Sequence, residues 1–272
     1  MEERTLDISF PSLPSTVTEV QSFIGSGKTN PEPLVEIIER DPSVSVNVLR
    51  RANSAYYGLR REVESVDHAV RLLGFIEICA ITMIEGMDKM RQRFSQHPAI
   101  FRSVLREAVF TGRFAQKMTA ALDLPLEWRR PSFLAGSIYV MGRLVLLYAA
   151  PTRYKELVAQ FEAPLPTTDA ERCAFGVSHR SLAPLASDRW GLPDRICSVL
   201  RVAEEPAPAP QGPRRTLALS LRSGSHFARQ DMTEEPFTLP ETLKEVGGEA
   251  IEARAAEVAE DVSSYVTESV RL

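Results

Sequence analysis

The sequence is poor in the residues that hold transition metals. Its only histidines and cysteines are His68, His97, His179, His226, Cys79, Cys173 and Cys197, in a chain of 272 residues. No two histidines are close enough in sequence to share one helical turn as a ready-made metal clip. Three scattered cysteines also exclude a disulfide scaffold and are typical of reduced core residues.

A basic charge balance and a long apolar run are also absent. The formal net charge is −4, so no global positive field draws the chain to nucleic acid or anionic lipid. The longest apolar stretch, Phe133–Pro151, contains Arg143 and is interpreted as a buried helix. Because no apolar run follows the opening Met-Glu-Glu-Arg, no secretory signal is expected. These features predict a cytoplasmic protein that binds neither nucleic acid nor membrane.

Several enzyme motifs are missing as well. The sequence contains no CxxC, HExxH or GxSxG motif, so the usual thiol, zinc and α/β-hydrolase sites have no place. The segment Gly25-Ser26-Gly27-Lys28 lacks both a preceding strand and the GxxxxGK spacing of a phosphate loop. It is interpreted as a turn that ends a helix.

Apolar residues recur at helical spacing along most of the chain, and no alternating strand of five or more residues is found. In the first third, Thr16-x-x-Glu19 is read as a capping box, and Asp41-Pro42 as a helix start. Ser65 is predicted to cap a helix that Gly74 ends, followed by a central buried helix over 75–90.

Longer elements are expected in the second third. The pattern predicts one helix over 99–122 and another over 128–149, kinked near Gly136 and Gly142. Four shorter helices are predicted over 151–163, 168–175, 178–190 and 193–203, each opened by a cap residue or a proline. The fold class is therefore predicted to be all-α.

The composition changes after residue 205. Prolines at 206, 208, 210 and 213 predict an extended linker over 206–213, and a helical extension over 214–272 follows it. Arg214–Gln230 carries four arginines and no acid. An acidic helix is expected over 249–272, with an apolar seam at Ile251, Ala255, Val258, Val262 and Tyr265. This seam packs either on the chain's own core or, in the alternative, against a second copy in a homodimer.

The segment LRRANSAYYG over 49–58 is richer in hydrogen-bonding groups than a helix end needs. Asn53 and Ser54 can satisfy free carbonyls at a helix C-terminus, and Tyr57 can insert its ring while its hydroxyl finds a partner. A structural role is one interpretation, and a partner or ligand surface is the other.

Several segments together resemble the HDOD domain of bacterial signalling proteins. They are PSLPSTVTEVQSFI, LVEIIERDPSVSVNVLRRANSAYYG, VESVDHAVRLLG, FLAGSIYVMGRLVLLYAAPTRY and ERCAFGVSHRSLAPLASDRWGLPDRI. The resemblance covers residues 8–205 and implies an HD-domain-like multi-helix bundle. We expect an N-terminal helical subdomain over 8–95 and an HD-like subdomain over 96–205, with 214–272 as its C-terminal helical extension.

HDOD domains resemble the HD phosphohydrolases, whose His and Asp side chains hold divalent metals that activate water. At the positions where that family has its metal ligands, this chain has Arg102, Tyr139, Val140, His179, Val202 and Ala203. Only one of these is an imidazole, and no acid lies between Glu205 and Asp231 where a carboxylate would follow. We therefore expect no metal and no cofactor, and we expect Arg143 to fill the vacated space with its own hydrogen bonds.

The resemblance implies bacterial signal transduction. The leading hypothesis is a non-catalytic scaffold that acts through protein–protein interaction. The alternative is a nucleotide or cyclic-dinucleotide sensor that binds its ligand in the vestigial HD pocket, with Arg102 and Arg143, or Arg214, Arg215 and Arg222, on phosphate. The third hypothesis is a metal-dependent phosphodiesterase, which the replaced ligand positions disfavour.

Overall fold

The computed structural model of the chain describes residues 10–54, 57, 59, 61–204, 212–240 and 249–269. Within these ranges every regular element is a helix, and no strand is present. The all-α prediction is therefore confirmed. Most of the expected proline-rich linker, residues 206–211, lies outside the described residues.

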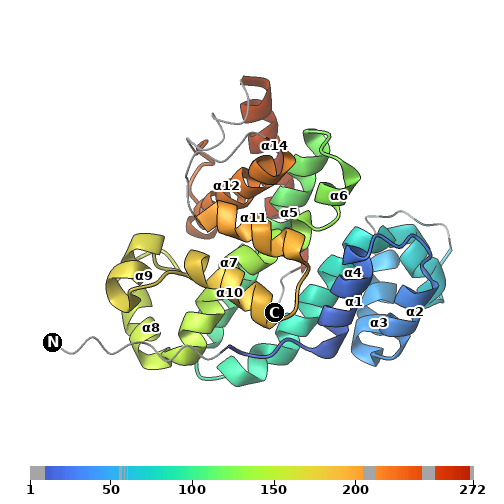
Figure 1. Cartoon of the computed structure of the whole chain (residues 1–272), viewed down its shortest axis with the longest axis horizontal. Coiled ribbons are helices and arrows are strands. Elements are labelled where there is room, and N and C mark those ends of the chain that lie inside the picture. The colour runs from blue at the N-terminus through green and yellow to red at the C-terminus, as the bar shows by residue number, and fades with distance from the viewer. Residues whose placement is uncertain are drawn as a thin grey trace. The chain divides into compact units, whose positions relative to one another are not determined.

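The chain divides into two compact units (Figure 1). One unit is Leu13–Gln92, and the other runs from Arg93 onward together with the residues before Leu13. Phe10 and Pro11 belong to the larger unit, since the Trp190 indole donates to the Pro11 carbonyl at 2.8 Å and the Arg189 guanidinium lies 5.6 Å from the Phe10 ring centroid.

The smaller unit contains α1 (Ser15–Gly25), α2 (Glu32–Glu39), α3 (Pro42–Ala52) and α4 (Val66–Met90). The first three helices all pack against α4, which carries the buried residues Ile78, Cys79 and Met83. Gly74 interrupts the helical path of α4 because its φ of 74° and ψ of 164° are non-helical. Glycine suits this position, since a residue with a side chain rarely adopts such a conformation. The expected helix end at Gly74 is thus a sharp kink, and the next helix begins without a loop.

Two start signals in this unit had different outcomes. The Ser65 hydroxyl accepts the His68 amide at 3.2 Å, so the predicted cap of α4 is confirmed. The capping box at Thr16 is wrong, because α1 begins at Ser15 and Pro14 is its N-cap. Thr16 instead donates its hydroxyl to Asp41 at 2.7 Å, which ties the first turn of α1 to the start of α3.

The larger unit is built around α5 (Pro98–Ala121) and α7 (Ser132–Ala149), which pack against each other over much of their length. The shorter helices around them are α6 (Leu126–Arg129), α8 (Pro151–Val158), α9 (Thr168–Phe175), α10 (His179–Arg189) and α11 (Asp194–Glu204). The 3₁₀ helix η2 (Arg91–Phe94) leads into α5. The helices predicted after residue 150 are thus found close to their expected positions.

The kinks predicted at Gly136 and Gly142 are absent, and α7 is continuous. The break lies earlier, between Arg129 and Ser132, because Pro131 cannot continue the preceding helix and instead starts the next one. Leu126–Ala149 is the one stretch in the described part of the chain that is long and apolar enough to cross a membrane. Its residues are mostly buried in the fold, as the prediction of a buried helix over Phe133–Pro151 required.

The C-terminal extension belongs to the larger unit. Helix α12 (Pro213–Thr233) packs on α5 and α11, and α14 (Glu249–Ser269) packs on α5 (Figure 1). The fully covered face of α14 is formed by Ala255, Ala259, Val262 and Val266. This face overlaps the predicted seam, although Val258 and Tyr265 are only partly covered. Ala255 and Val262 of the predicted seam therefore pack within the chain, whereas the side chain of Ile251 lies outside the described residues.

Candidate functional site

Helix α7 carries a charged side chain into the centre of the larger unit. Arg143 is 1% exposed, although the surrounding α7 residues are apolar or small. Its Nε donates to Glu107 Oε2 at 2.8 Å, and its Nη1 donates to Glu171 Oε1 at 2.5 Å and to the Pro166 carbonyl at 3.0 Å. The guanidinium group thus joins a carboxylate of α5 to a carboxylate of α9, which satisfies the expectation that Arg143 makes its own hydrogen bonds here.

His179 begins α10 and is bound to the same centre. Its backbone amide donates to Glu171 Oε2 at 2.8 Å, and its Nδ1 lies 2.5 Å from the same oxygen. Gly142 allows this approach, because a Cβ at that position would overlap the His179 carbonyl oxygen. The glycine therefore brings α7 against the first turn of α10.

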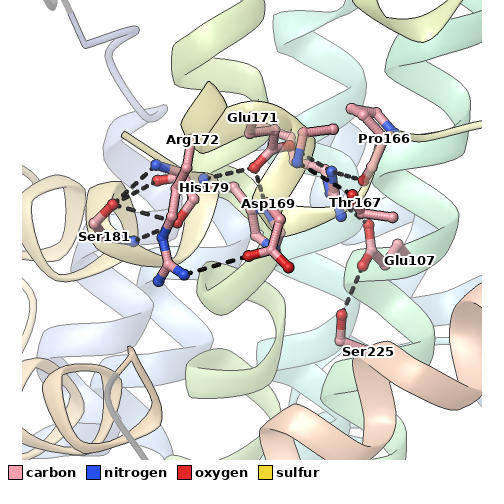
Figure 2. A network of polar contacts seen from close by, with 12 residues as sticks. Glu107, Pro166, Thr167, Asp169, Glu171, Arg172, His179, Ser181 and Ser225 are labelled. Atoms are coloured by element: carbon pink, nitrogen blue, oxygen red, sulfur yellow. Dashed lines mark hydrogen bonds and ion pairs between the residues drawn. The ribbon is translucent and has the colours of Figure 1, made fainter. Parts of the chain in front are cut away.

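Two further side chains complete the hydrogen bonding of the carboxylates. Ser225 of α12 donates to Glu107 Oε1 at 2.8 Å, and the Tyr154 hydroxyl donates to Glu171 Oε1 at 3.2 Å. Figure 2 shows Glu107 and Ser225 pointing toward each other, with Glu171 beside His179. We call Arg143, Glu107, Glu171, His179, Tyr154 and Ser225 the buried polar centre.

The charges of the buried polar centre set its protonation. Burial raises the pKa of the Glu171 carboxyl, but the Arg143 charge and the bonds from His179 outweigh this effect and leave it at about 2. Burial, followed by the Arg143 charge, lowers the pKa of His179. Glu171 is therefore ionised and His179 is neutral near pH 7, with the Nδ1 proton directed at the carboxylate.

The residues of this centre do not fit the divalent metal that the HD phosphohydrolase resemblance implies. Each oxygen of Glu107 and Glu171 already accepts a hydrogen bond from the protein, and the Arg143 charge lies between the two carboxylates. A cation bound there would have to displace a guanidinium that both carboxylates hold. Across the described ranges, no group of three or more His, Cys, Asp or Glu side chains could hold a metal ion.

The predicted metal-site positions are only partly brought together. Tyr139 and His179 are fully buried, with ring centroids 6.3 Å apart and rings nearly perpendicular. Val140 and Ala203 are buried, Val202 is half-buried, and Arg102 is exposed on α5. Arg102 has no hydrogen bond or ion pair to another described residue, so it takes no part in the buried polar centre.

Of the residues predicted as a partner or ligand surface, Asn53, Ser54 and Tyr57 lie in the smaller unit and make local contacts. Arg143 was also predicted there, but it is buried because two carboxylates hold its guanidinium group, so it forms no surface. The Asn53 amide donates to the Val63 carbonyl at 2.9 Å and accepts the Val63 amide at 2.7 Å. This favours the structural interpretation for Asn53, which joins the end of α3 to the segment before α4. Ser54 has a buried hydroxyl without a hydrogen bond, and Tyr57 is half-buried with the Arg51 guanidinium 6.0 Å from its ring centroid.

The sequence reasoning missed the two carboxylates. Glu107 lies in the long helix α5, on the side that carries buried apolar residues such as Val104 and Ala108. A carboxylate among core residues is the signal that would have found it, since such a group is rarely buried unpaired. Glu171 carried less signal, because an acid in the first turn of a helix is ordinary.

Comparison with known proteins gives one family. The HDOD domain model matches residues 10–206. An HDOD domain protein of unknown function from Geobacter sulfurreducens has a similar structure, with a TM-score of 0.74, 14% identity, and coverage of 97% of this chain and 94% of that one. A candidate phosphohydrolase from Shewanella amazonensis SB2B has a TM-score of 0.60 and 18% identity, with 95% of this chain and 90% of that chain covered.

Other similar proteins are longer. A candidate signal transduction protein from Marinobacter aquaeolei VT8 has a TM-score of 0.74 and 22% identity, and the match covers 99% of this chain and 61% of that one. An uncharacterized protein of Treponema pallidum is 23% identical over 74% of this chain, and YuxH of Bacillus subtilis, also uncharacterized, is 33% identical over 32% of it. The matches span only 39% and 22% of these two relatives. Because the family model covers well over half of the sequence, the chain belongs to the HDOD family.

Proposed function

We propose that this HDOD protein is a non-catalytic signalling module that acts by binding another protein. The observation that carries the proposal is the Arg143 guanidinium, held between Glu107 and Glu171 where metal chemistry would need open ligands. A centre in which charge and hydrogen bonds are already satisfied is suited to holding helices together. The signalling context is supported by the family and by the similarity to a candidate signal transduction protein.

The contact surface is proposed to lie on the smaller unit, around Tyr57. Tyr57 is half-buried, and the nearby Leu59 is 41% exposed, so both present apolar area to solvent. Tyrosine is enriched at protein interfaces because its ring buries a large area while its hydroxyl stays hydrogen-bonded. Leu126 in the larger unit is also an exposed apolar side chain, and it serves as a control because it lies outside the proposed contact surface.

The experiment has a binding arm and a catalytic arm. The full chain is used as bait in affinity purification with mass spectrometry, beside Tyr57→Ala and the matched control Leu126→Ala. We expect a protein enriched by the wild type and by Leu126→Ala and lost with Tyr57→Ala, because truncating an aromatic anchor costs about 2 kcal/mol or more. Equal recovery with all three baits, or with none, contradicts the proposed surface.

In the catalytic arm, the wild type is incubated with a generic phosphodiester and Mn²⁺. We expect hydrolysis no faster than with Glu107→Gln, which removes one carboxylate of the buried polar centre. Turnover that depends on Mn²⁺ and is lost in Glu107→Gln would reject the non-catalytic function in favour of the phosphodiesterase.

A further inference from the structure

Next to the buried polar centre, three buried polar atoms have no hydrogen-bond partner. They are the Tyr139 hydroxyl, His179 Nε2 and Arg180 Nε. Leaving one such group unpaired costs about 1–3 kcal/mol. Because Tyr139 and His179 lie edge to face and Arg180 follows His179 in α10, the three atoms belong to one region of the fold.

Arginines without carboxylate partners surround this region. The Arg180 guanidinium carbon lies 5.5 Å from the Tyr139 ring centroid, and Arg180 makes no hydrogen bond or ion pair to any described residue. Arg222 of α12 likewise makes no hydrogen bond or ion pair to another described residue. Both residues are half-buried, and neither has, among the described residues, the counter-charge that normally offsets the desolvation of a charged group.

The geometry of α12 places Arg222 on the side of the site. Arg222, Ser225 and Arg229 are spaced by three and four residues, so they share one helix face. Ser225 on that face reaches Glu107, and Arg229 donates to the Pro166 carbonyl at 2.8 Å. Burial raises the pKa of the Tyr139 hydroxyl, and the positive charges of Arg180 and Arg222 oppose this rise. Both charges therefore act on the Tyr139 hydroxyl.

Among the charged groups already named in this region, arginines outnumber carboxylates. Arg143, Arg180, Arg222 and Arg229 bring four positive charges, against the two negative charges of Glu107 and Glu171. His179 adds no charge, because burial and Arg143 lower the pKa of its imidazole. An anionic ligand would offset this excess.

We infer that Arg180, Arg222 and Tyr139 form a binding site for a phosphoryl group, bounded by α7, α10 and α12. The two guanidinium groups would bind phosphate oxygens, and the Tyr139 hydroxyl would donate beneath them. Planar guanidinium groups match phosphate oxygens in a bidentate geometry, which favours a phosphoryl group over a spherical anion.

This site shares Arg222 and the Tyr139 position with the nucleotide-sensor hypothesis from the sequence, but it adds Arg180 and does not use the other arginines of that hypothesis. Arg102 is exposed and has no part in it, and Arg143 is already held by two carboxylates. Arg214 lies exposed at the start of α12, two turns before Arg222. The inference is independent of the proposed protein–protein interaction, because the site lies in the larger unit and the proposed contact surface lies in the smaller one.

Isothermal titration calorimetry of the full chain tests the site at constant ionic strength. The probes are inorganic phosphate, guanosine 5′-monophosphate and cyclic di-guanylate, which separate a free phosphate from a nucleotide source of the same group. The variants are Arg180→Gln, Arg222→Gln and Tyr139→Phe, with Arg214→Gln as the matched control on α12. Circular dichroism verifies that each variant is folded.

We expect saturable binding of at least one probe by the wild type and by Arg214→Gln. Arg180→Gln and Arg222→Gln should each weaken this binding about tenfold or more, and Tyr139→Phe by less, because bonds to charged groups are the stronger ones. The site is rejected if no probe binds the wild type, or if binding is unchanged in both Arg180→Gln and Arg222→Gln.

Discussion

Arg143 carries its charge into a region where an isolated ion would cost several kcal/mol. Its stability there depends on Glu107 and Glu171, which are both 0% exposed. Conversely, the two carboxylates depend on Arg143, since without it they would be two like charges in the interior. The charge that blocks a metal site is therefore also the charge that the fold requires.

Arg143→Met tests this dependence. Methionine keeps much of the side-chain length but leaves two buried carboxylates unpaired, so we expect a loss of about 3–5 kcal/mol in the free energy of unfolding. Urea denaturation followed by circular dichroism gives the value.

The matched control is the triple variant Arg143→Met/Glu107→Gln/Glu171→Gln, which removes all three charges together. It should recover most of the loss, and it keeps the test decisive if the single variant does not fold. A single variant within about 1 kcal/mol of the wild type would show that the ion pairs do not hold this centre together.

At the scale of elements, the contact between α7 and the start of α10 depends on Gly142. Because an added Cβ would overlap the His179 carbonyl oxygen, Gly142→Ala must push α10 away from α7. We expect a loss of about 1–3 kcal/mol, the range for overpacking a core, and weaker bonds between His179 and Glu171. The measurements are thermal unfolding and the imidazole NMR shifts of His179, and unchanged values in both would contradict the prediction.

The sequence predicted most of the helices, but it did not predict which side chains of different helices contact each other. Start signals such as Ser65 and Asp41-Pro42 act within one turn, so the sequence displays them directly. The pairing of Glu107 with Arg143 joins two helices, and nothing local to either residue indicates it. The role of Gly142 was also hidden in the sequence. A glycine that lets two helices approach closely cannot be told in sequence from one that bends a helix.

At the scale of the molecule, the extension after residue 206 is part of the larger unit although the family model ends there. Helix α12 covers α5, with the Phe114 and Phe227 ring centroids 5.2 Å apart, and it supplies Ser225 to the buried polar centre. Helix α14 adds a smaller apolar face made of alanine and valine. A homodimer through α14 stays a prediction. The fully covered residues of α14 already pack within the chain, so such a dimer would have to use other residues of this helix.

Two truncations separate the roles of these helices. A chain that ends at Glu204 loses α12, exposes the aromatic face of α5 and leaves Glu107 without its Ser225 bond. We expect it to aggregate or to lose cooperative unfolding, because an exposed apolar face of this kind promotes association. A chain that ends at Pro240 keeps α12 and should unfold cooperatively at a lower temperature. Size-exclusion chromatography and calorimetry distinguish these outcomes. If the chain that ends at Glu204 unfolds cooperatively at the wild-type temperature, α12 is not part of the core.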